Sequence, residues 1–150
     1  MKLSGLFAHW SEIRTDLVMT IDKFTNDELN YIPANTDWSV GKIMLHIAEA
    51  EEGWFHYAVT QNLKEWPVIE VEAYPNKAAV KGVLAEVHGR TERYLSTLML
   101  PDLDRDVVPP WGSGPIKLEW IIWHVLEHEI HHRGELSLIL GLLGKEGLDN

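Results

Sequence analysis

Apolar side chains recur every three or four residues over four long stretches of the chain, which is the period of an amphipathic α-helix. The first stretch begins at Leu3 and reaches Phe24, and the second joins Ile43 to Ala58. The third covers residues 80–98 and the fourth covers residues 117–143. Four helices of about 20 residues match the lengths found in helical bundles. The pattern predicts an all-α four-helix bundle, and no stretch alternates convincingly enough to predict a strand.

Polar residues at the ends of these stretches predict where the helices begin and end. Thr25 and Glu28 have the spacing of a capping box, which opens a short helical turn. Ser39 and Asn76 are N-cap candidates for the second and third helices. Gly144 is a natural C-cap of the fourth.

Two segments lack helical periodicity and predict connections. Residues 62–75 contain two prolines and indicate a crossing connection, and residues 101–115 contain four prolines and two glycines and indicate a loop. A length of 150 residues is typical of one domain, so residues 1–150 are interpreted as a single unit.

Composition and charge exclude several classes of protein. The chain has no cysteine, which excludes disulfides, thiolate zinc sites and a thiol nucleophile of its own. Lys and Arg total 13 against 23 acidic residues, and this balance argues against nucleic-acid binding. No stretch resembles a signal peptide or a membrane span, so we expect a cytoplasmic protein with no membrane partner.

Half of the eight histidines lie within nine residues of the fourth predicted helix. His128 and His132 are four residues apart and therefore share one helix face, where two imidazoles can chelate one ion. They lie on the same stripe as Leu136 and Ile139, so they face the bundle interior. His131 points about 60° away from this face, and we expect it not to be a ligand.

A chelating pair needs a third ligand, and His46 on the apolar stripe of the second helix is the candidate. Three neutral imidazoles leave coordination positions open for water or substrate, as in catalytic sites. Imidazole ligands suit zinc, nickel, iron or cobalt, and we expect one divalent ion, zinc or nickel.

Several motifs together resemble the DinB/YfiT-like family of metalloenzymes. They are the segment Trp38-Ser39-Val40-Gly41, the segment His46–Glu51, the pair His124-Val125 and the segment His128–Glu135. The resemblance covers the whole chain and implies a four-helix bundle with an up-down-down-up order, often dimeric. It implies that the metal ligands are His46, His128 and His132. One departure is Glu135, where the family commonly has Gln.

The resemblance also implies an activity. Characterised members are metal-dependent transferases for low-molecular-weight thiols, including bacillithiol and mycothiol, and thiol-dependent isomerases. We therefore expect a divalent-metal-dependent transferase acting with a thiol cosubstrate and an electrophile, in detoxification or stress, as a homodimer. The alternative is a metal-binding stress-response interaction module without catalysis.

The segment His128-Glu129-Ile130-His131-His132 also satisfies the HExxH signature of zinc peptidases, in which Glu129 would be the general base. The extended form of that signature is not met, few residues remain for a distant acidic ligand, and no strand is expected to hold a peptide. A zinc peptidase is therefore the weaker hypothesis.

Other side chains near the histidines are candidates for secondary roles. His124 lies one turn before His128 and is, with Glu129, a candidate acid or base. Arg133 and Trp111 are candidates for cofactor binding. A surface salt bridge is the simpler interpretation of Arg133, and an interface or a packed loop is an equal alternative for Trp111. Arg14 has the same two interpretations as Arg133.

Trp10 and Trp54 lie on helical stripes and are expected in the core.

Overall fold

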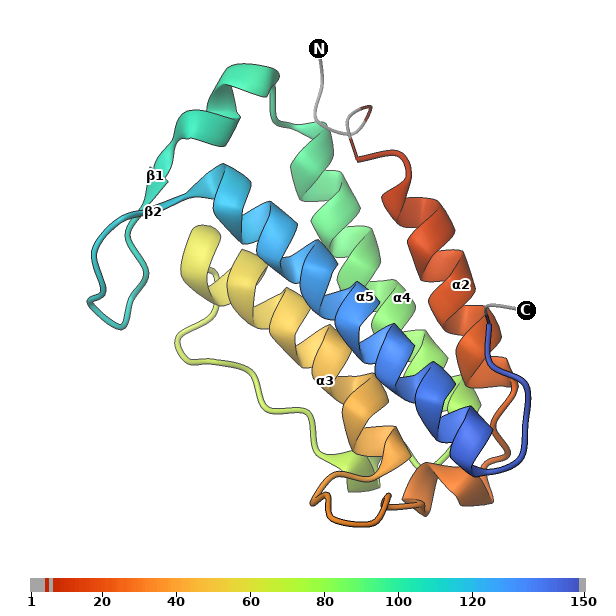
Figure 1. Cartoon of the computed structure of the whole chain (residues 1–150). Helices are drawn as coiled ribbons and strands as arrows, with labels where there is room; N and C mark the ends of the chain where they lie inside the picture. The colour runs from red at the N-terminus through yellow and green to blue at the C-terminus, as the bar shows by residue number, and fades with distance from the viewer. Residues whose placement is uncertain (1–4, 6, 149–150) are drawn as a thin grey trace.

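Four long α-helices carry the predicted apolar stripes in the computed structural model, which describes residues 5 and 7–148 (Figure 1). They are α2 (Trp10–Asp22), α3 (Val40–Glu52), α4 (Lys77–Ser96) and α5 (Leu118–Leu142). Short helical turns lie between them: η1 (Asp27–Asn30), η2 (Gly53–Val59), η3 (Val71–Ala73) and η4 (Leu100–Asp104). The all-α four-helix bundle is confirmed. The expected first turns of the first helix, at Leu3 and Leu6, lie outside the described residues.

The helix ends are fixed by the capping residues that the sequence predicts. The Thr25 amide donates to Glu28 Oε2 (2.7 Å) and the Glu28 amide donates to Thr25 Oγ1 (3.3 Å), which forms the expected capping box at η1. Ser39 and Asn76 accept hydrogen bonds from the amides of the first turns of α3 and α4. Gly144 takes a positive φ of 74°, which ends α5.

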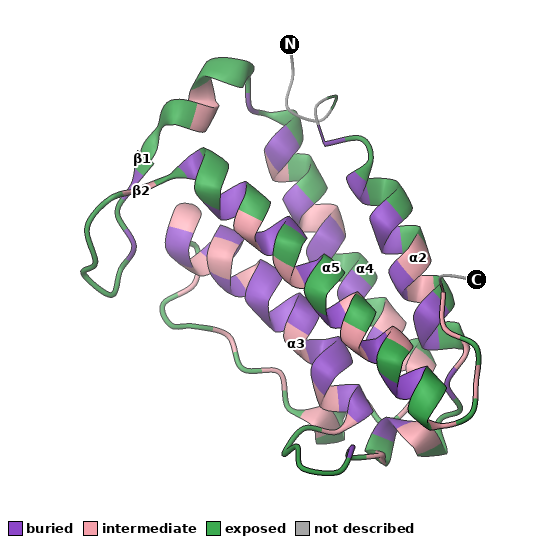
Figure 2. Cartoon of the chain, viewed as in Figure 1, coloured by how far each residue is buried: buried purple, intermediate pink, exposed green. Residues whose placement is uncertain are grey.

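The connection between α3 and α4 determines the topology. It runs back along the bundle, so that α3 and α4 point in the same direction while α2 and α5 point the opposite way (Figure 1). This is the up-down-down-up order, seen here from the other end. Within this order α3 packs on both α4 and α5, and most of its residues are buried (Figure 2).

Two local features differ from the sequence-based expectation. The predicted loop at residues 101–115 is followed by strand β2 (Ile116–Lys117), which pairs antiparallel with β1 (Asp106–Val107) inside that loop. The second feature is η2, a π-helix that continues α3. Its wider turn shifts the buried face, so that Phe55 is fully buried and Trp54 is only half-buried, which corrects the expected core position of Trp54.

The apolar core consists of two clusters separated by a polar layer. One cluster includes Leu17, Ile21, Ile43, Leu84 and Leu136, and the other includes Trp10, Phe55, Leu95, Ile121 and Val125. Each helix contributes a buried ionisable side chain to this layer, and these four side chains contact one another: Arg14, Glu51, His88 and Glu129. Trp10 is 3% exposed, which confirms its expected burial.

No helix among the described residues is long and apolar enough to cross a membrane.

Candidate metal centre

Three imidazoles from two helices meet at one point of the bundle. His46 comes from α3, and His128 and His132 come from successive turns of α5. His128 Nε2 lies 3.0 Å from His46 Nε2 and 3.2 Å from His132 Nε2. The structure therefore brings together the three residues that the sequence singled out as metal ligands.

Two carboxylates hold the opposite nitrogens of these rings. Glu49 Oε2 lies 3.2 Å from His46 Nδ1, and Glu135 Oε2 lies 2.7 Å from His132 Nδ1. Glu49 also accepts a hydrogen bond from the Ile69 amide (3.0 Å), which ties the crossing connection to the site. Carboxylates in this position fix the tautomer and orientation of a ligating imidazole.

The arrangement of nitrogen lone pairs fits a bound cation. Because the Nδ1 atoms of His46 and His132 donate to carboxylates, their Nε2 atoms carry lone pairs. Both lone pairs point at His128 Nε2, which can donate a proton to only one of them. Nitrogens bound to a tetrahedral zinc ion at about 2.0–2.1 Å lie about 3.3 Å apart, close to the spacing observed. A divalent ion would satisfy all three nitrogens.

The environment favours the neutral form of His128 and His132, the form that ligation requires. Burial, reinforced by the neighbouring imidazoles of His132 and His46, lowers the pKa of His128 from 6.5 to about 3. Burial also lowers the pKa of His132, against the opposing effect of Glu135. Protons therefore do not compete with an ion for these two ligands at neutral pH.

A second set of ligand atoms shares His132 with the first. His131, His132 and Glu135 also have ligand atoms within 4.8 Å of one another. His131 is exposed, whereas the first set is partly or fully buried. The first set also converges through three Nε2 atoms, so it is the better candidate.

Aromatic side chains flank the three histidines on two sides. On one side the Trp38 ring lies 4.7 Å from the His46 ring and 6.4 Å from the His132 ring. On the other side His124 lies 6.4 Å from His128 and stacks on Trp120, with 4.6 Å between ring centroids. Trp38 and Trp120 are 39% and 50% exposed, so each offers a free face to a planar or apolar molecule.

The remaining sequence candidates lie at different distances from this cluster. Trp111 packs against Trp54, Tyr57 and Trp66, as part of an aromatic group that reaches His124 through Trp54. Arg133 pairs with Asp16 at 3.1 Å, which is the simpler interpretation that the sequence offered. The cofactor-binding roles of Trp111 and Arg133 stay predictions.

Glu129 faces a different part of the molecule from the three ligand nitrogens. Its Oε2 accepts hydrogen bonds from Trp10 Nε1 (2.8 Å) and Arg14 Nη2 (2.9 Å). Burial raises the pKa of Glu129, while the Arg14 charge opposes that rise. This position gives Glu129 a structural contact within the polar layer, and its catalytic role stays a prediction.

The other members of the polar layer were not singled out together by the sequence. Arg14 Nη2 donates to Glu51 Oε2 (2.6 Å), and Glu51 Oε1 accepts from His88 Nδ1 (2.8 Å). Arg14 is therefore part of a buried network, which replaces its expected role as a surface ion pair. The sequence does contain one indication of this layer, because each of its members is a polar residue at a position where the apolar stripe of its helix would have an apolar one.

The contact between Glu135 and His132 gives a testable prediction. Replacing Glu135 by Ala should weaken divalent-metal affinity by about 10-fold to 100-fold, because the His132 ring loses its orienting acceptor. Glu135→Gln should lose less metal affinity, since the amide oxygen of Gln still accepts a hydrogen bond from His132 Nδ1. Competition with a chromophoric chelator measures both affinities. Glu127→Ala, an exposed change on the same helix, controls for the lost charge, and an equal effect there would contradict the prediction.

Comparison with known proteins places this geometry in a family. The model of the DinB superfamily matches residues 9–136. The chain belongs to the DinB superfamily. No curated protein matches it.

Solved structures of the same superfamily have the same fold. A DinB-like protein from Bacillus cereus is 17% identical, with a TM-score of 0.73 over 95% of this chain and 93% of that one. A DinB-like protein from Bacillus subtilis is 18% identical, with a TM-score of 0.71 over 93% and 92%. YfiT from Bacillus subtilis is 22% identical, with a TM-score of 0.62 over 90% and 85%. YfiT is described as a probable metal-dependent hydrolase with an unusual four-helix bundle topology.

Proposed function

We propose that this DinB-superfamily protein is a metal-dependent transferase that joins a low-molecular-weight thiol to an electrophile. The convergence of three imidazole Nε2 atoms supports the proposal most directly. His46, His128 and His132 would hold the ion, and Glu49 and Glu135 would orient two of them. When bound, a divalent ion supplies a Lewis acid that favours ionisation of a thiol at neutral pH.

The residues around the three ligands have supporting roles in this proposal. His124 is half-buried beside His128 and would accept the thiol proton. Trp38 and Trp120 would bind the flat or apolar part of the electrophile. Because the chain contains no cysteine, the sulfur must come from outside the protein.

A metal-dependent hydrolase is the second candidate, favoured by the likeness to YfiT. In such an enzyme water takes the place of the thiol at the same ion. A peptidase that follows the HExxH mechanism requires Glu129 as the base, yet its carboxylate is engaged by Trp10 and Arg14. The two candidates therefore differ in the nucleophile and in their dependence on Glu129.

The deciding experiment compares thiol conjugation and hydrolysis by metal-loaded protein and by Glu129→Gln. We expect metal-dependent consumption of bacillithiol or mycothiol with an aromatic electrophile such as monobromobimane. Glu129→Gln should lower this rate only modestly, because Gln can still accept the Trp10 hydrogen bond. A general base contributes about two to four orders of magnitude in rate, so a peptidase would lose its activity.

Thermal unfolding of the Glu129→Gln variant separates a catalytic loss from a folding defect. Peptide hydrolysis that requires Glu129 but survives His46→Ala would refute the transferase proposal.

A further inference from the structure

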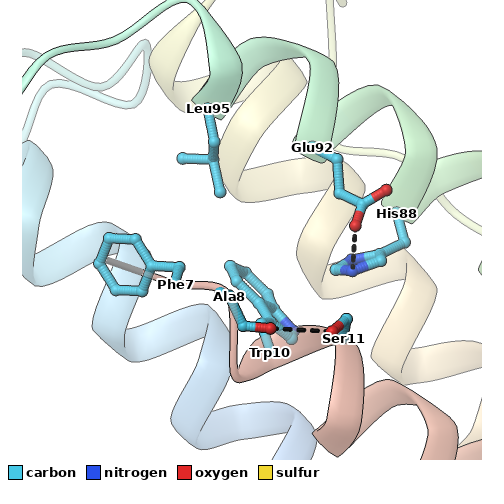
Figure 3. Close-up of a pocket in the computed structure, with 7 residues that line it drawn as sticks. All are labelled: Phe7, Ala8, Trp10, Ser11, His88, Glu92 and Leu95. Carbon is cyan, nitrogen blue, oxygen red and sulfur yellow. Dashed lines mark hydrogen bonds and ion pairs between the residues drawn. The ribbon is translucent and has the colours of Figure 1, made fainter. Parts of the chain in front are cut away.

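A cavity of about 220 Å³ lies between the N-terminal end of α2 and the C-terminal half of α4 (Figure 3). Its lining comes from α4 and from Phe7, Ala8, Trp10 and Ser11, whereas the three histidines of the metal centre come from α3 and α5. The cavity is therefore separate from the proposed active site.

Apolar groups form most of its walls. Phe7, Trp10 and Leu95 line it, and their exposed fractions are 6%, 3% and 4%. Phe7 and Leu95 lie toward one end, and the Trp10 ring lies between this end and the polar groups (Figure 3). Such a surface favours an aromatic or branched apolar body of a few heavy atoms.

The opposite end of the cavity is polar and is built on a buried hydrogen bond. His88 is only 7% exposed, and its Nδ1 donates to the buried Glu51 carboxylate at 2.8 Å. Its other nitrogen, Nε2, is buried and has no hydrogen-bond partner among the described residues. Glu92 Oε1 lies 3.8 Å from this Nε2, beside the same cavity (Figure 3).

The charges around this end favour a cation. Burial alone would raise the pKa of Glu51, but the Arg14 charge and the His88 hydrogen bond lower it to about 2. Glu51 is therefore an anion that accepts the hydrogen bond from His88 Nδ1, and in the neutral form of this ring the lone pair lies on Nε2. Arg14 contacts Glu51 and Glu129 directly, whereas the Glu92 carboxylate faces the His88 ring at 3.8 Å.

We propose that this cavity is a second ligand site, which binds a small primary amine with an aromatic or branched apolar body. The ammonium group donates to His88 Nε2 and to the Glu92 carboxylate, and the apolar body lies against Trp10, Phe7 and Leu95. Aromatic faces add attraction for a cation within about 6 Å.

Two other functions of this cavity fit the contacts less well. A hydrolase would need the Ser11 hydroxyl to donate to His88, but Ser11 Oγ donates to the Ala8 carbonyl at 2.8 Å. A metal site would need three ligands, and the sets of three found among the described residues do not include His88 or Glu92.

The experiment titrates metal-loaded protein with phenethylamine and follows the indole N–H signals by NMR. We expect saturable 1:1 binding with a Kd of about 1 mM, which is typical of a ligand of this size. The Trp10 indole signal should shift while that of Trp38, beside the metal centre, stays unchanged. Phenethyl alcohol, the neutral isostere, should bind about tenfold more weakly because it lacks the charge-assisted hydrogen bonds.

Matched variants test the two halves of the site. Glu92→Gln should weaken phenethylamine binding about tenfold, whereas Glu86→Gln removes the same charge elsewhere on α4 and should leave the affinity within about twofold. Ala8→Leu places a branched side chain at the exposed rim and should abolish binding. Glu92 and Ala8 are both surface positions, so these variants should fold.

An amine can also coordinate a metal ion, so His46→Ala provides the remaining control. The cavity does not involve His46, and phenethylamine should bind this variant with unchanged affinity. Loss of binding in His46→Ala, or no saturable binding to the intact protein, would overturn the proposal. Equal affinity for phenethylamine in Glu92→Gln, Ala8→Leu and the intact protein would do the same.

Discussion

Replacing Glu51 by Gln is expected to destabilise the protein by about 3–5 kcal/mol, the usual cost of removing one partner from a buried ion pair. Glu51 is fully buried between Arg14 and His88, and its carboxylate accepts from both. The neutral amide leaves the buried Arg14 charge with Glu129 as its one remaining carboxylate contact among the described residues. Urea unfolding at pH 7, with chelator present to remove any metal contribution, measures the difference.

Glu52→Gln is the matched control for this change. Glu52 is the next residue along the chain and pairs with Arg90 at 2.5 Å on a partly exposed surface. Ion pairs of that kind contribute about 0–1 kcal/mol. If Glu51→Gln and Glu52→Gln lower the free energy of unfolding equally, the buried ion pair of the polar layer contributes no more stability than a surface ion pair.

The pH dependence of the same variant has a definite sign. The pKa of Glu51 lies at about 2 in the folded protein, below its ordinary value of 4.5. Its contribution is therefore fully present above about pH 4.5 and is lost as the pH falls toward 2. Complete loss of this contribution lowers the free energy of unfolding by about 3 kcal/mol. The gap between wild type and Glu51→Gln should be constant from pH 5 to pH 7 and should narrow below pH 4.5.

The four helices could be predicted because the buried positions of a helix are apolar and recur every three or four residues along the sequence. Positions such as Leu17, Ile43, Leu84 and Leu136 recur with that period and form one core cluster. His46 and His132 could be found for the same reason, since an imidazole on an apolar stripe needs a partner. The three-histidine cluster could be predicted because the apolar stripes of the second and fourth helices, which carry these residues, face each other in a bundle.

The polar layer is harder to predict, because each of its members is unremarkable alone. Arg14, Glu51 and His88 come from three helices, and their contacts depend on the relative rotation of those helices. A sequence defines the face of each helix but not which residues meet at one level of the bundle. The cavity beside His88 is a consequence of that packing and has no motif of its own.

Local backbone irregularities were missed for a different reason. The π-helix η2 turns Phe55 inward and Trp54 outward, and a wider turn has no characteristic residue pattern. At Gly53, the first residue of η2, the Trp66 indole packs where a Cβ would lie. The strands β1 and β2 have two residues each, too few for an alternating pattern to be visible.

The metal centre gives the second large expected effect. Protein purified without an affinity tag should bind about one divalent ion per chain, and His46→Ala, His128→Ala and His132→Ala should each weaken binding by more than about 100-fold. Loss of an orienting residue already costs about 10-fold to 100-fold, and loss of a ligand removes a bond to the ion itself. Metal analysis and chelator competition measure stoichiometry and affinity.

The two overlapping sets of ligand atoms make this test decisive. Both sets contain His132, so that variant alone does not separate them. His46 and His128 belong only to the buried set, and His131 belongs only to the exposed set with Glu135. We expect His131→Ala to retain the ion with nearly unchanged affinity, because its imidazole is exposed and lies outside the three converging Nε2 atoms. Metal loss in His131→Ala together with retention in His46→Ala and His128→Ala would move the centre to the surface of α5 and remove the basis of the proposed transferase.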